Sequence, residues 1–355
     1  SVYLVDRTIP MLPEQLSNGL CSLRPKEEKL TFSAVFEINH QGKVFDKWFG
    51  RTVIYSDRRF AYEDAQEIIE GNAGDYQEEI LLLNDLAGKI REQRFANGAV
   101  NFESVEVKFR LDVKGKPLEV IPKERKEAHK MIEEFMLLAN REVATFIFDK
   151  KKGKQPEDSL PFVYRVHNDP DPEKLDNFSK FASRFGHQLL TQGRISKNLN
   201  KLLADIQGKP EQHILESIAI RSMAKARHTT DPKGHFGLAF EHYTHFTSPI
   251  RRYPDVMVHR LLWDYLEGKN PPEKEAIEQK CMHSSEREKR AAEAERASIK
   301  FKQVEFMSGM LGETFDGIVS GVTEWGLFVE ISATKCEGMI RIADIDHDQF
   351  QYDAI

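Results

Sequence analysis

The sequence predicts an α+β protein that ends in a small all-β unit, and three observations support this fold class. Segments in which apolar and polar residues alternate, typical of half-buried strands, occur in the first third of the chain. Long stretches with helical periodicity fill much of the remainder. After Gly312 the sequence changes to short runs rich in Val, Ile and Phe, separated by turn residues. We therefore expect one α+β domain over residues 1–308 and the first strands of a small barrel over 312–355.

Strands and helices are predicted in alternation along the first half of the chain. The alternating segments 29–38 and 43–55 are joined by His40, Gln41 and Gly42, which predicts a β-hairpin. A second pair of strands turns at Lys114 and Gly115. The predicted strands of this half are 29–38, 43–55, 102–111 and 117–121, and the predicted helices are 62–71, 77–97 and about 123–148.

The second half is predicted to be mostly helical until residue 309. Residues 161–167, PFVYRVH, have the composition of a buried strand. Helical patterns then occupy 172–186, 197–206, 210–226 and about 272–309. In the last of these, Glu286 precedes Lys289 and Arg290 by three and four residues, a spacing that stabilises a helix. FDGIVSGV, GLFVEI and EGMIRI are the three short strands predicted after Gly312.

Charge and cysteine content narrow the classes of protein that remain. The formal net charge is −6, so any nucleic-acid site must be a local basic surface rather than an overall charge. Cys21, Cys281 and Cys336 are far apart and form no CxxC pair, which predicts neither a disulfide framework nor a zinc site and favours the cytoplasm. No apolar run reaches about 18 residues, so no membrane span is expected. The chain starts without an initiator Met or a basic leader, and we expect it to be a fragment.

The stretch from Tyr243 to Leu262, YTHFTSPIRRYPDVMVHRLL, combines aromatic, hydroxyl and basic groups. Ser248 and Pro249 are typical of the N-cap and first residue of a helix. That start would place Arg251 and Arg252 in the first turn, where two guanidinium groups at a positive helix end favour a phosphate. An ordinary pair of surface ion-pair partners remains the alternative interpretation.

Five stretches, taken in order, carry a resemblance to a known family. Together they resemble the RNase II / RNase R family of 3′-to-5′ exoribonucleases, with greater similarity to the RNase R type. The resemblance implies that residues 1–308 are an RNB catalytic domain, a mixed sheet wrapped by helices, and that 312–355 begin a truncated S1-type OB-fold RNA-binding domain. The stretches are SVYLVDRTIPMLPEQLSNGLCSLRP at 1–25, EAHKMIEEFMLLANREVA at 127–144, FVYRVHNDP at 162–170, HFGLAFEHYTHFTSPIRRYPDVMVHRLL at 235–262 and ETFDGIVSGVTEWGLFVEI at 313–331.

The resemblance implies Mg²⁺ as the cofactor, with its ligands outside this chain. In the family, four aspartates in a DxxxxxDxDD-like cluster bind magnesium upstream of the tyrosine that matches Tyr3. The chain begins after that cluster, so we expect no metal ligands in it and no activity of the fragment alone. The run ADIDHD, with Asp344, Asp346 and Asp348, is interpreted as a solvated loop.

The matching positions imply roles in binding and cutting RNA. Tyr3 and Phe102 match the aromatic pair that stacks on the 3′-terminal base, and each has an alternative as a packing residue. Glu133 matches the glutamate near the terminal ribose, with the edge of an apolar stripe as its alternative. Arg251 matches the arginine nearest the scissile phosphate, and Arg252 suits a looser phosphate contact.

Other candidates follow from position and chemistry. Glu293 is our choice over Glu295 as the acid that orients Arg251 or a water, although a solvated helix face explains both equally well. Arg165 and His167 point to the same side of the predicted strand, and a buried arginine there needs a phosphate or a carboxylate as its partner.

Several aromatic residues and histidines have weaker assignments. Phe315 and Phe328 are expected to stack on RNA bases, while Trp325 also flanks the barrel strands. The spacing of His235, His242 and His245 matches neither HxH nor HExxH, so structural or channel-lining roles are favoured over a metal site.

The function implied by this resemblance is a processive, magnesium-dependent hydrolytic exoribonuclease that releases nucleoside 5′-monophosphates. Its partner would be the 3′ end of single-stranded and possibly structured RNA, without an obligate protein partner. Two alternatives stay open. One is a catalytically inactive RNA-binding protein with an RNB fold, and the other is an interaction scaffold built on the charged helix 272–309.

Overall fold

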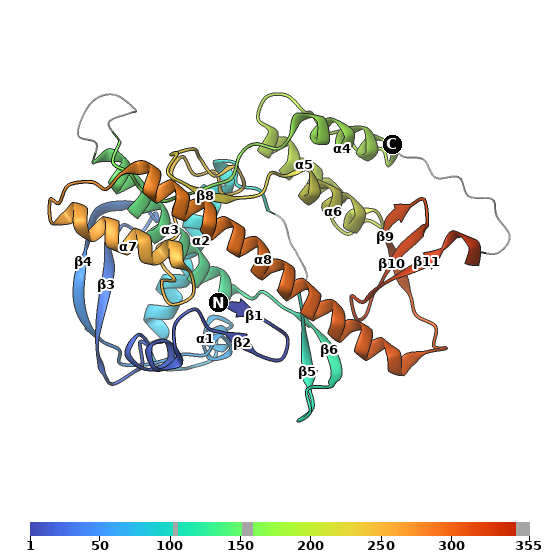
Figure 1. Ribbon diagram of the computed structural model, residues 1–355, viewed down its shortest axis with the longest axis horizontal. Helices are drawn as coiled ribbons and strands as arrows, with labels where there is room; N and C mark the ends of the chain where they lie inside the picture. The colour runs from blue at the N-terminus through green and yellow to red at the C-terminus, as the bar shows by residue number, and fades with distance from the viewer. Residues whose placement is uncertain (102–105, 151–158, 346–355) are drawn as a thin grey trace.

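The computed structural model describes residues 1–101, 106–150 and 159–345, and most of the predicted elements are present (Figure 1). All five sheets are antiparallel: β1–β2, β3–β4, β5–β6, β7–β8 and a three-stranded sheet in the order β11-β10-β9. The strands are β1 Val2–Tyr3, β2 Thr8–Ile9, β3 Glu28–Ile38, β4 Val44–Tyr55, β5 Glu106–Leu111, β6 Pro117–Lys123, β7 Tyr164–Val166, β8 Arg227–Thr229, β9 Gly317–Thr323, β10 Gly326–Ile331 and β11 Glu337–Arg341. The helices are α1 Tyr62–Ile69, α2 Gln77–Ala96, α3 Glu127–Asp149, α4 Pro172–Arg184, α5 Ile195–Ile206, α6 Gln212–Ser222, α7 Tyr253–Leu266 and α8 Lys274–Met307.

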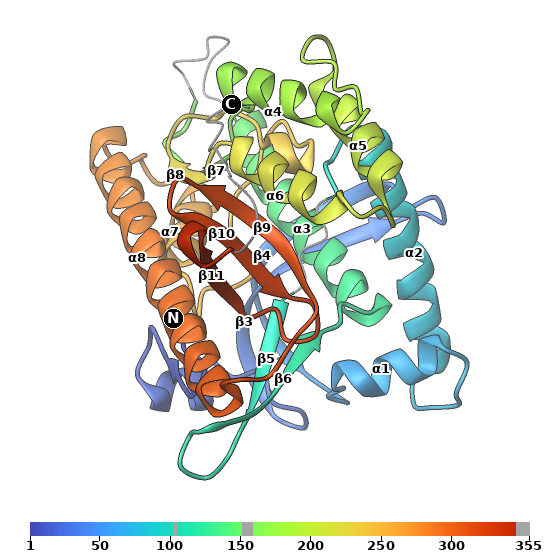
Figure 2. The same ribbon diagram turned by 90° about the vertical axis from the view of Figure 1, so that its right-hand side faces the viewer.

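The main core lies between the long β3–β4 hairpin and helices α3 and α7 (Figures 1 and 2). Phe32, Ala34 and Phe36 of β3 share one face, as the period of two requires, and pack against this core. Val258 and Leu262 of α7 are completely buried in it. Because α3 and α7 are anchored in the same core, the residues that they carry are held at a constant separation.

Helices α4, α5 and α6 form a second core of their own. Leu175, Leu199, Ile206 and Leu215 are each at most 1% exposed in it. These helices lie beside the β9–β11 sheet, away from the β3–β4 hairpin (Figure 1). His213 of α6 approaches Glu330 of β10 at 3.6 Å between Nε2 and Oε2, so the helical unit and this sheet are in direct contact.

Helix α8 crosses the molecule from the main core to the β9–β11 sheet (Figure 1). Only Ile277 and Cys281, near its start, are buried among its described side chains, which agrees with the charged sequence of this helix. None of the described helices is long and apolar enough to span a membrane.

Two predictions of structure need correction. The strand predicted at 161–167 is limited to Tyr164–Val166, because its partner β8 offers only three paired residues. The helix predicted at 210–226 ends at Ser222. The three short strands predicted after Gly312 are present as the open sheet of β9, β10 and β11 in the described part of the chain, and their assignment to a barrel stays a prediction.

Candidate active site

The helix that follows the two arginines starts later than predicted. Helix α7 begins at Tyr253, so Ser248 is not its N-cap and Arg251 and Arg252 lie before it. Pro254 explains the difference: near the helix start its missing N–H has no consequence, whereas deeper inside a helix it would leave a carbonyl without a donor. Residues 248–251 instead form a separate turn, in which Ser248 O accepts from Arg251 N at 3.2 Å and Arg252 N at 3.1 Å. We call residues 248–252 the arginine turn.

A buried carboxylate holds the arginine turn against α7. Asp255 is completely buried, and its Oδ1 accepts a hydrogen bond of 2.7 Å from the Ser248 amide. The Arg252 guanidinium donates to the same carboxylate through Nε and Nη2, both at 2.9 Å. This two-point contact orients Arg252 and compensates the buried charge of Asp255.

Arg251 differs from its neighbour because its guanidinium is exposed. It forms no ion pair or hydrogen bond with any residue that the structure describes. Its backbone is nevertheless held, since its carbonyl oxygen accepts a hydrogen bond of 2.8 Å from the Ser1 nitrogen. An unpaired guanidinium on an anchored backbone is available to an external anion.

The N-terminal hairpin β1–β2 brings Tyr3 to the same region. The Tyr3 amide donates to Glu295 Oε1 of α8 at 2.8 Å, and the Val5 amide donates to Ser298 Oγ at 3.1 Å. The Tyr3 side chain itself remains 47% exposed. Its ring is therefore free to stack on a planar group, while its backbone is fixed on α8.

The same contact distinguishes the two candidate glutamates. Glu295 contacts the hairpin, whereas Glu293 is exposed on a part of α8 about 200° further round the helix. The role predicted for Glu293 stays a prediction, and Glu295 is the one of the two glutamates that contacts Tyr3.

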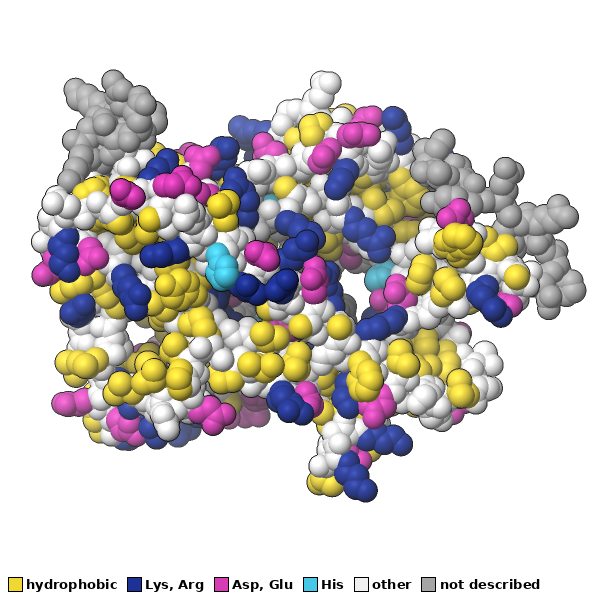
Figure 3. Space-filling view, in the orientation of Figure 1, with side chains coloured by type: hydrophobic (Ala, Val, Ile, Leu, Met, Phe, Trp, Pro, Cys, Tyr) yellow, Lys and Arg dark blue, Asp and Glu magenta, His cyan; other side chains and the backbone are white. Residues whose placement is uncertain are grey.

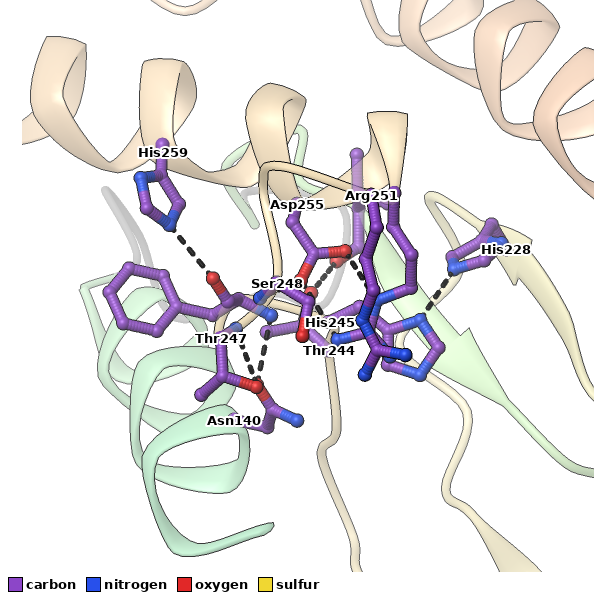
Figure 4. A network of polar contacts seen from close by, with 12 residues as sticks. Asn140, His228, Thr244, His245, Thr247, Ser248, Arg251, Asp255 and His259 are labelled. Atoms are coloured by element: carbon purple, nitrogen blue, oxygen red, sulfur yellow. Dashed lines mark hydrogen bonds and ion pairs between the residues drawn. The ribbon is translucent and has the colours of Figure 1, made fainter. Parts of the chain in front are cut away.

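The Arg165 side chain forms an ion pair with a carboxylate. Its Nη1 and Nη2 donate to Glu288 of α8 at 2.6 and 2.9 Å. Nη1 also lies 3.4 Å from His228 Nδ1, and because an arginine only donates, that nitrogen must accept. His228 then carries its proton on Nε2 and donates to His245 Nδ1 at 3.1 Å (Figure 4). A line of hydrogen bonds therefore runs from α8 to the loop before the arginine turn.

His167 has a structural role in the described chain. Its Nδ1 accepts from the Gly237 amide at 3.1 Å, and its Nε2 donates to Ala224 O at 2.7 Å. Both ring nitrogens are thus occupied by backbone groups, and any contact with a substrate would have to use the ring face. Its position just beyond β7 still places it two residues from Arg165, as predicted.

The histidines of this region are held neutral by burial. Loss of water around the charged form lowers the pKa of His228 and His245 well below 6.5, and the nearby guanidinium groups of Arg165 and Arg252 add to the effect. Burial, with the positive charges of His167 and Arg165, lowers the pKa of His235 to about 3. These rings are therefore neutral at pH 7, and those of His228 and His245 serve as hydrogen-bond donor and acceptor.

We expect the protein to lose stability as the pH falls from about 6.5 toward 5. A histidine whose folded-state pKa is lowered contributes stability that is fully present above its unfolded value of 6.5 and is lost as the pH falls toward the folded value. Urea denaturation at pH 7.5, 6.0 and 5.0 measures this loss, above the range in which carboxylates titrate. The His235→Gln variant should show a shallower dependence, and an unfolding midpoint that does not move between pH 7.5 and 5.0 would contradict the assignment.

Helix α3 carries two adjacent glutamates with opposite environments. Glu133, predicted to approach a ribose, is partly exposed and pairs with Arg125. Glu134 is 2% exposed and forms a two-point ion pair with Arg94 of α2, which sequence reasoning missed. Phe102, the predicted stacking partner of Tyr3, lies outside the described residues.

The aromatic residues predicted in the C-terminal unit are accessible to different extents. Trp325 is 70% exposed in the turn between β9 and β10, Phe315 is 37% exposed just before β9, and Phe328 is half-buried in the central strand β10. Asp344 lies in a short turn and pairs with Arg341, as expected for a solvated loop, while Asp346 and Asp348 lie outside the described residues.

The described residues do not supply a metal site. Within residues 1–101, 106–150 and 159–345, no group of three His, Cys, Asp or Glu side chains is arranged to hold a metal ion. His235 contacts the rings of His167 and Tyr243, and His242 stacks on Phe148. The donor set therefore does not fit Mg²⁺, and we derive no chemical step through a metal from this chain.

Basic and acidic side chains are mixed on the face of the molecule that α8 crosses. In Figure 3, Lys and Arg side chains gather over the middle of α8, interspersed with acidic side chains, although the formal net charge of the chain is −6.

The fold and the site together define an α+β domain with an arginine turn that is open to an anion. The family follows from a comparison with family models: the model of the RNB domain matches residues 1–268, and the chain belongs to this family. The resemblance stated from the sequence is thereby confirmed.

Several of the similar proteins are ribonucleases R. Ribonuclease R 1 of Lactococcus lactis is 39% identical, covering 99% of this chain and 44% of that protein. Ribonuclease R of Thermotoga maritima is 40% identical, and the match covers 99% of this chain and 50% of the Thermotoga protein. Among solved structures, Mycoplasma genitalium RNase R in complex with ribose methylated single-stranded RNA has a TM-score of 0.90 and 26% identity, covering 99% of this chain and 56% of that one. The chain thus spans about half the length of the curated relatives that it matches.

Proposed function

We propose that the full-length protein containing this chain is a hydrolytic 3′-to-5′ exoribonuclease that degrades RNA processively to nucleoside 5′-monophosphates. Membership of the RNB domain family and the similarity to ribonucleases R over nearly the whole chain support this proposal. No observation favours an inactive RNA-binding protein or a scaffold over an enzyme.

The observation that carries the proposal is the state of Arg251. Its guanidinium is exposed and unpaired within the described chain, while its turn is anchored by Asp255 and lies beside the hairpin of Tyr3. A phosphodiester gains negative charge on its phosphoryl oxygens as it is attacked, and a preorganised guanidinium stabilises that charge through two hydrogen bonds. Arg252, tied to Asp255, would add positive potential with less freedom to move.

In this proposal Mg²⁺, when bound, would activate the attacking water, and its ligands would not come from the residues that the structure describes. The residues described here would hold the substrate: Arg251 the phosphate and Tyr3 the terminal base. We extend the proposal to the other predicted contacts, namely Phe102, Glu133, Arg165, His167, Glu293, Phe315 and Phe328. The β9–β11 sheet would be the beginning of an S1-type OB fold, and the reaction would take place in the cytoplasm.

The Tyr3→Ala variant tests the function and the place of Tyr3 in it. A stacked base contributes about 1–3 kcal/mol, so losing the ring should release short RNAs earlier and lengthen the final product without abolishing cleavage. The measurement is the product ladder of a 5′-labelled single-stranded RNA cut by the full-length protein with Mg²⁺.

Tyr3→Phe, which keeps the ring, serves as the matched control and should give the parent ladder. An identical ladder for Tyr3→Ala would remove Tyr3 from the substrate site. If the parent protein releases no nucleoside 5′-monophosphates from RNA, the proposed function itself is wrong.

A further inference from the structure

The backbone of the loop that leads into the arginine turn is held by hydrogen bonds to side chains. Residues 246–248 belong to no strand or helix, and side chains accept the hydrogen bonds of all three amides. Phe246 N and Thr247 N donate to Asn140 Oδ1 at 2.9 and 3.1 Å, and Ser248 N donates to Asp255 Oδ1 at 2.7 Å (Figure 4). Two side chains, one from α3 and one from α7, therefore determine the path of the chain toward Arg251.

Asn140 can support the loop because it is buried and both polar atoms of its side-chain amide form hydrogen bonds. It is 3% exposed, and its Nδ2 donates to the Tyr243 hydroxyl at 3.0 Å while its Oδ1 accepts the two amides. One side chain thus binds the loop at residue 243 and again at 246 and 247. The amide group cannot rotate without breaking all three contacts at once.

We infer that Asn140 is a positioning residue for Arg251, an inference that rests on the proposed function. Asn140 and Glu133 lie seven residues apart on α3, about two helical turns on the same face. Asn140 therefore joins the helix proposed to approach the ribose to the turn proposed to hold the phosphate. Asn140 is thus a direct link between these two parts of the site, beside the contact that Asp255 makes from α7.

The loss of Oδ1 leaves two N–H groups without an acceptor in a buried place. Each costs about 1–3 kcal/mol if the loop stays where it is, so the loop would instead shift to reach water. A displacement of about 1 Å at a reacting group can reduce the rate roughly 100-fold. Binding of a long RNA depends on many contacts and should change little.

The test compares Asn140→Leu with Asn140→Asp in the full-length protein. Leucine has a similar size and removes the acceptor, and we expect a roughly 100-fold lower single-turnover cleavage rate with the Kd for RNA within about threefold of the parent. Aspartate keeps an acceptor for both amides, and the Tyr243 hydroxyl can donate to its second oxygen, so most of the lost rate should return. Tyr243→Phe, which removes one of the three contacts of Asn140 and keeps both backbone amide contacts, should lower the rate far less than Asn140→Leu.

The possible outcomes separate this inference from the proposed function. A parent protein that cleaves RNA, together with an Asn140→Leu variant that cleaves equally fast, would overturn the positioning role alone. The positioning role would also be overturned if Asn140→Leu lost rate and affinity in equal proportion, or if Asn140→Asp cleaved as slowly as Asn140→Leu. If the leucine variant does not fold, Asn140→Gln replaces it, because its amide is shifted by one methylene and must also lower the rate. A parent that cuts no RNA would overturn both proposals.

Discussion

The full-length Arg251→Ala variant is expected to cleave RNA more slowly by roughly two to three orders of magnitude, while binding RNA almost as well as the parent. The reason is that the Arg251 guanidinium has no partner among the described residues and is proposed to meet its counter-charge in a phosphate. Its contribution is greatest when that phosphate gains charge, so the rate suffers more than the affinity. Single-turnover rates and the Kd for the same single-stranded RNA measure the two effects separately.

Two further variants sharpen the interpretation of Arg251. Arg251→Lys keeps the charge but loses the planar two-point contact, and its rate should lie between those of the parent and the alanine variant. Arg252→Ala should behave differently, because it leaves the buried carboxylate of Asp255 without its cation and lowers the free energy of unfolding. An unchanged single-turnover rate in Arg251→Ala would remove this residue from the chemistry.

The largest effect on stability is expected for Glu134→Ala. Glu134 and Arg94 form an ion pair in which the side chains are 2% and 8% exposed, and removing the carboxylate leaves a buried guanidinium without compensation. Breaking such a pair costs about 3–5 kcal/mol. We expect a value near the lower end, because both residues also line a polar cavity of about 510 Å³ through which water can reach the arginine. Urea denaturation measures the change in the free energy of unfolding.

The adjacent residue supplies the matched control. Glu133 pairs with Arg125, and these side chains are 34% and 54% exposed, so Glu133→Ala should cost at most about 1 kcal/mol. The double variant Arg94→Met, Glu134→Leu should recover most of the loss, since it removes both buried charges. Equal losses for Glu133→Ala and Glu134→Ala would show that burial of the pair does not determine its contribution.

The elements of the fold were predictable wherever the pattern that specifies them is local. Alternation identified the β3–β4 hairpin, apolar spacing identified α3, and charge pairs three and four residues apart supported α8, because strands and helices impose periods of 2.0 and 3.6 on nearby residues. The start of α7 was predicted four residues too early, since the capping signal at Ser248 was followed although Pro254 favours a later start. The three strands predicted after Gly312 are present as an open sheet in the described chain, and their assignment to a barrel stays a prediction.

The arginine turn itself was identified from the sequence, because its residues are consecutive and their order is distinctive. The residues that interact with each arginine and give it its role could not be identified from the sequence, because most of them are remote in the chain. Asn140 accepts a hydrogen bond from the amide of Phe246, 106 residues further along the chain. Glu288 lies 123 residues after its partner Arg165, and Glu295 lies 292 residues after its partner Tyr3. No periodicity connects such positions. An asparagine on the buried face of α3 was the single sequence signal that a side chain there accepts hydrogen bonds from the backbone of a loop.

The sequence alone thus determined the type of protein, the strands and helices, and the place of the arginine pair, because these depend on local order and spacing. Only the tertiary structure decided which arginine is free and which is bound, which glutamate accompanies Tyr3, and which side chains carry the loop. The physical reason is that a charge or a hydrogen-bonding group acquires its role from what surrounds it in space. Folding brought Asp255 to Arg252 and left Arg251 without a partner among the described residues.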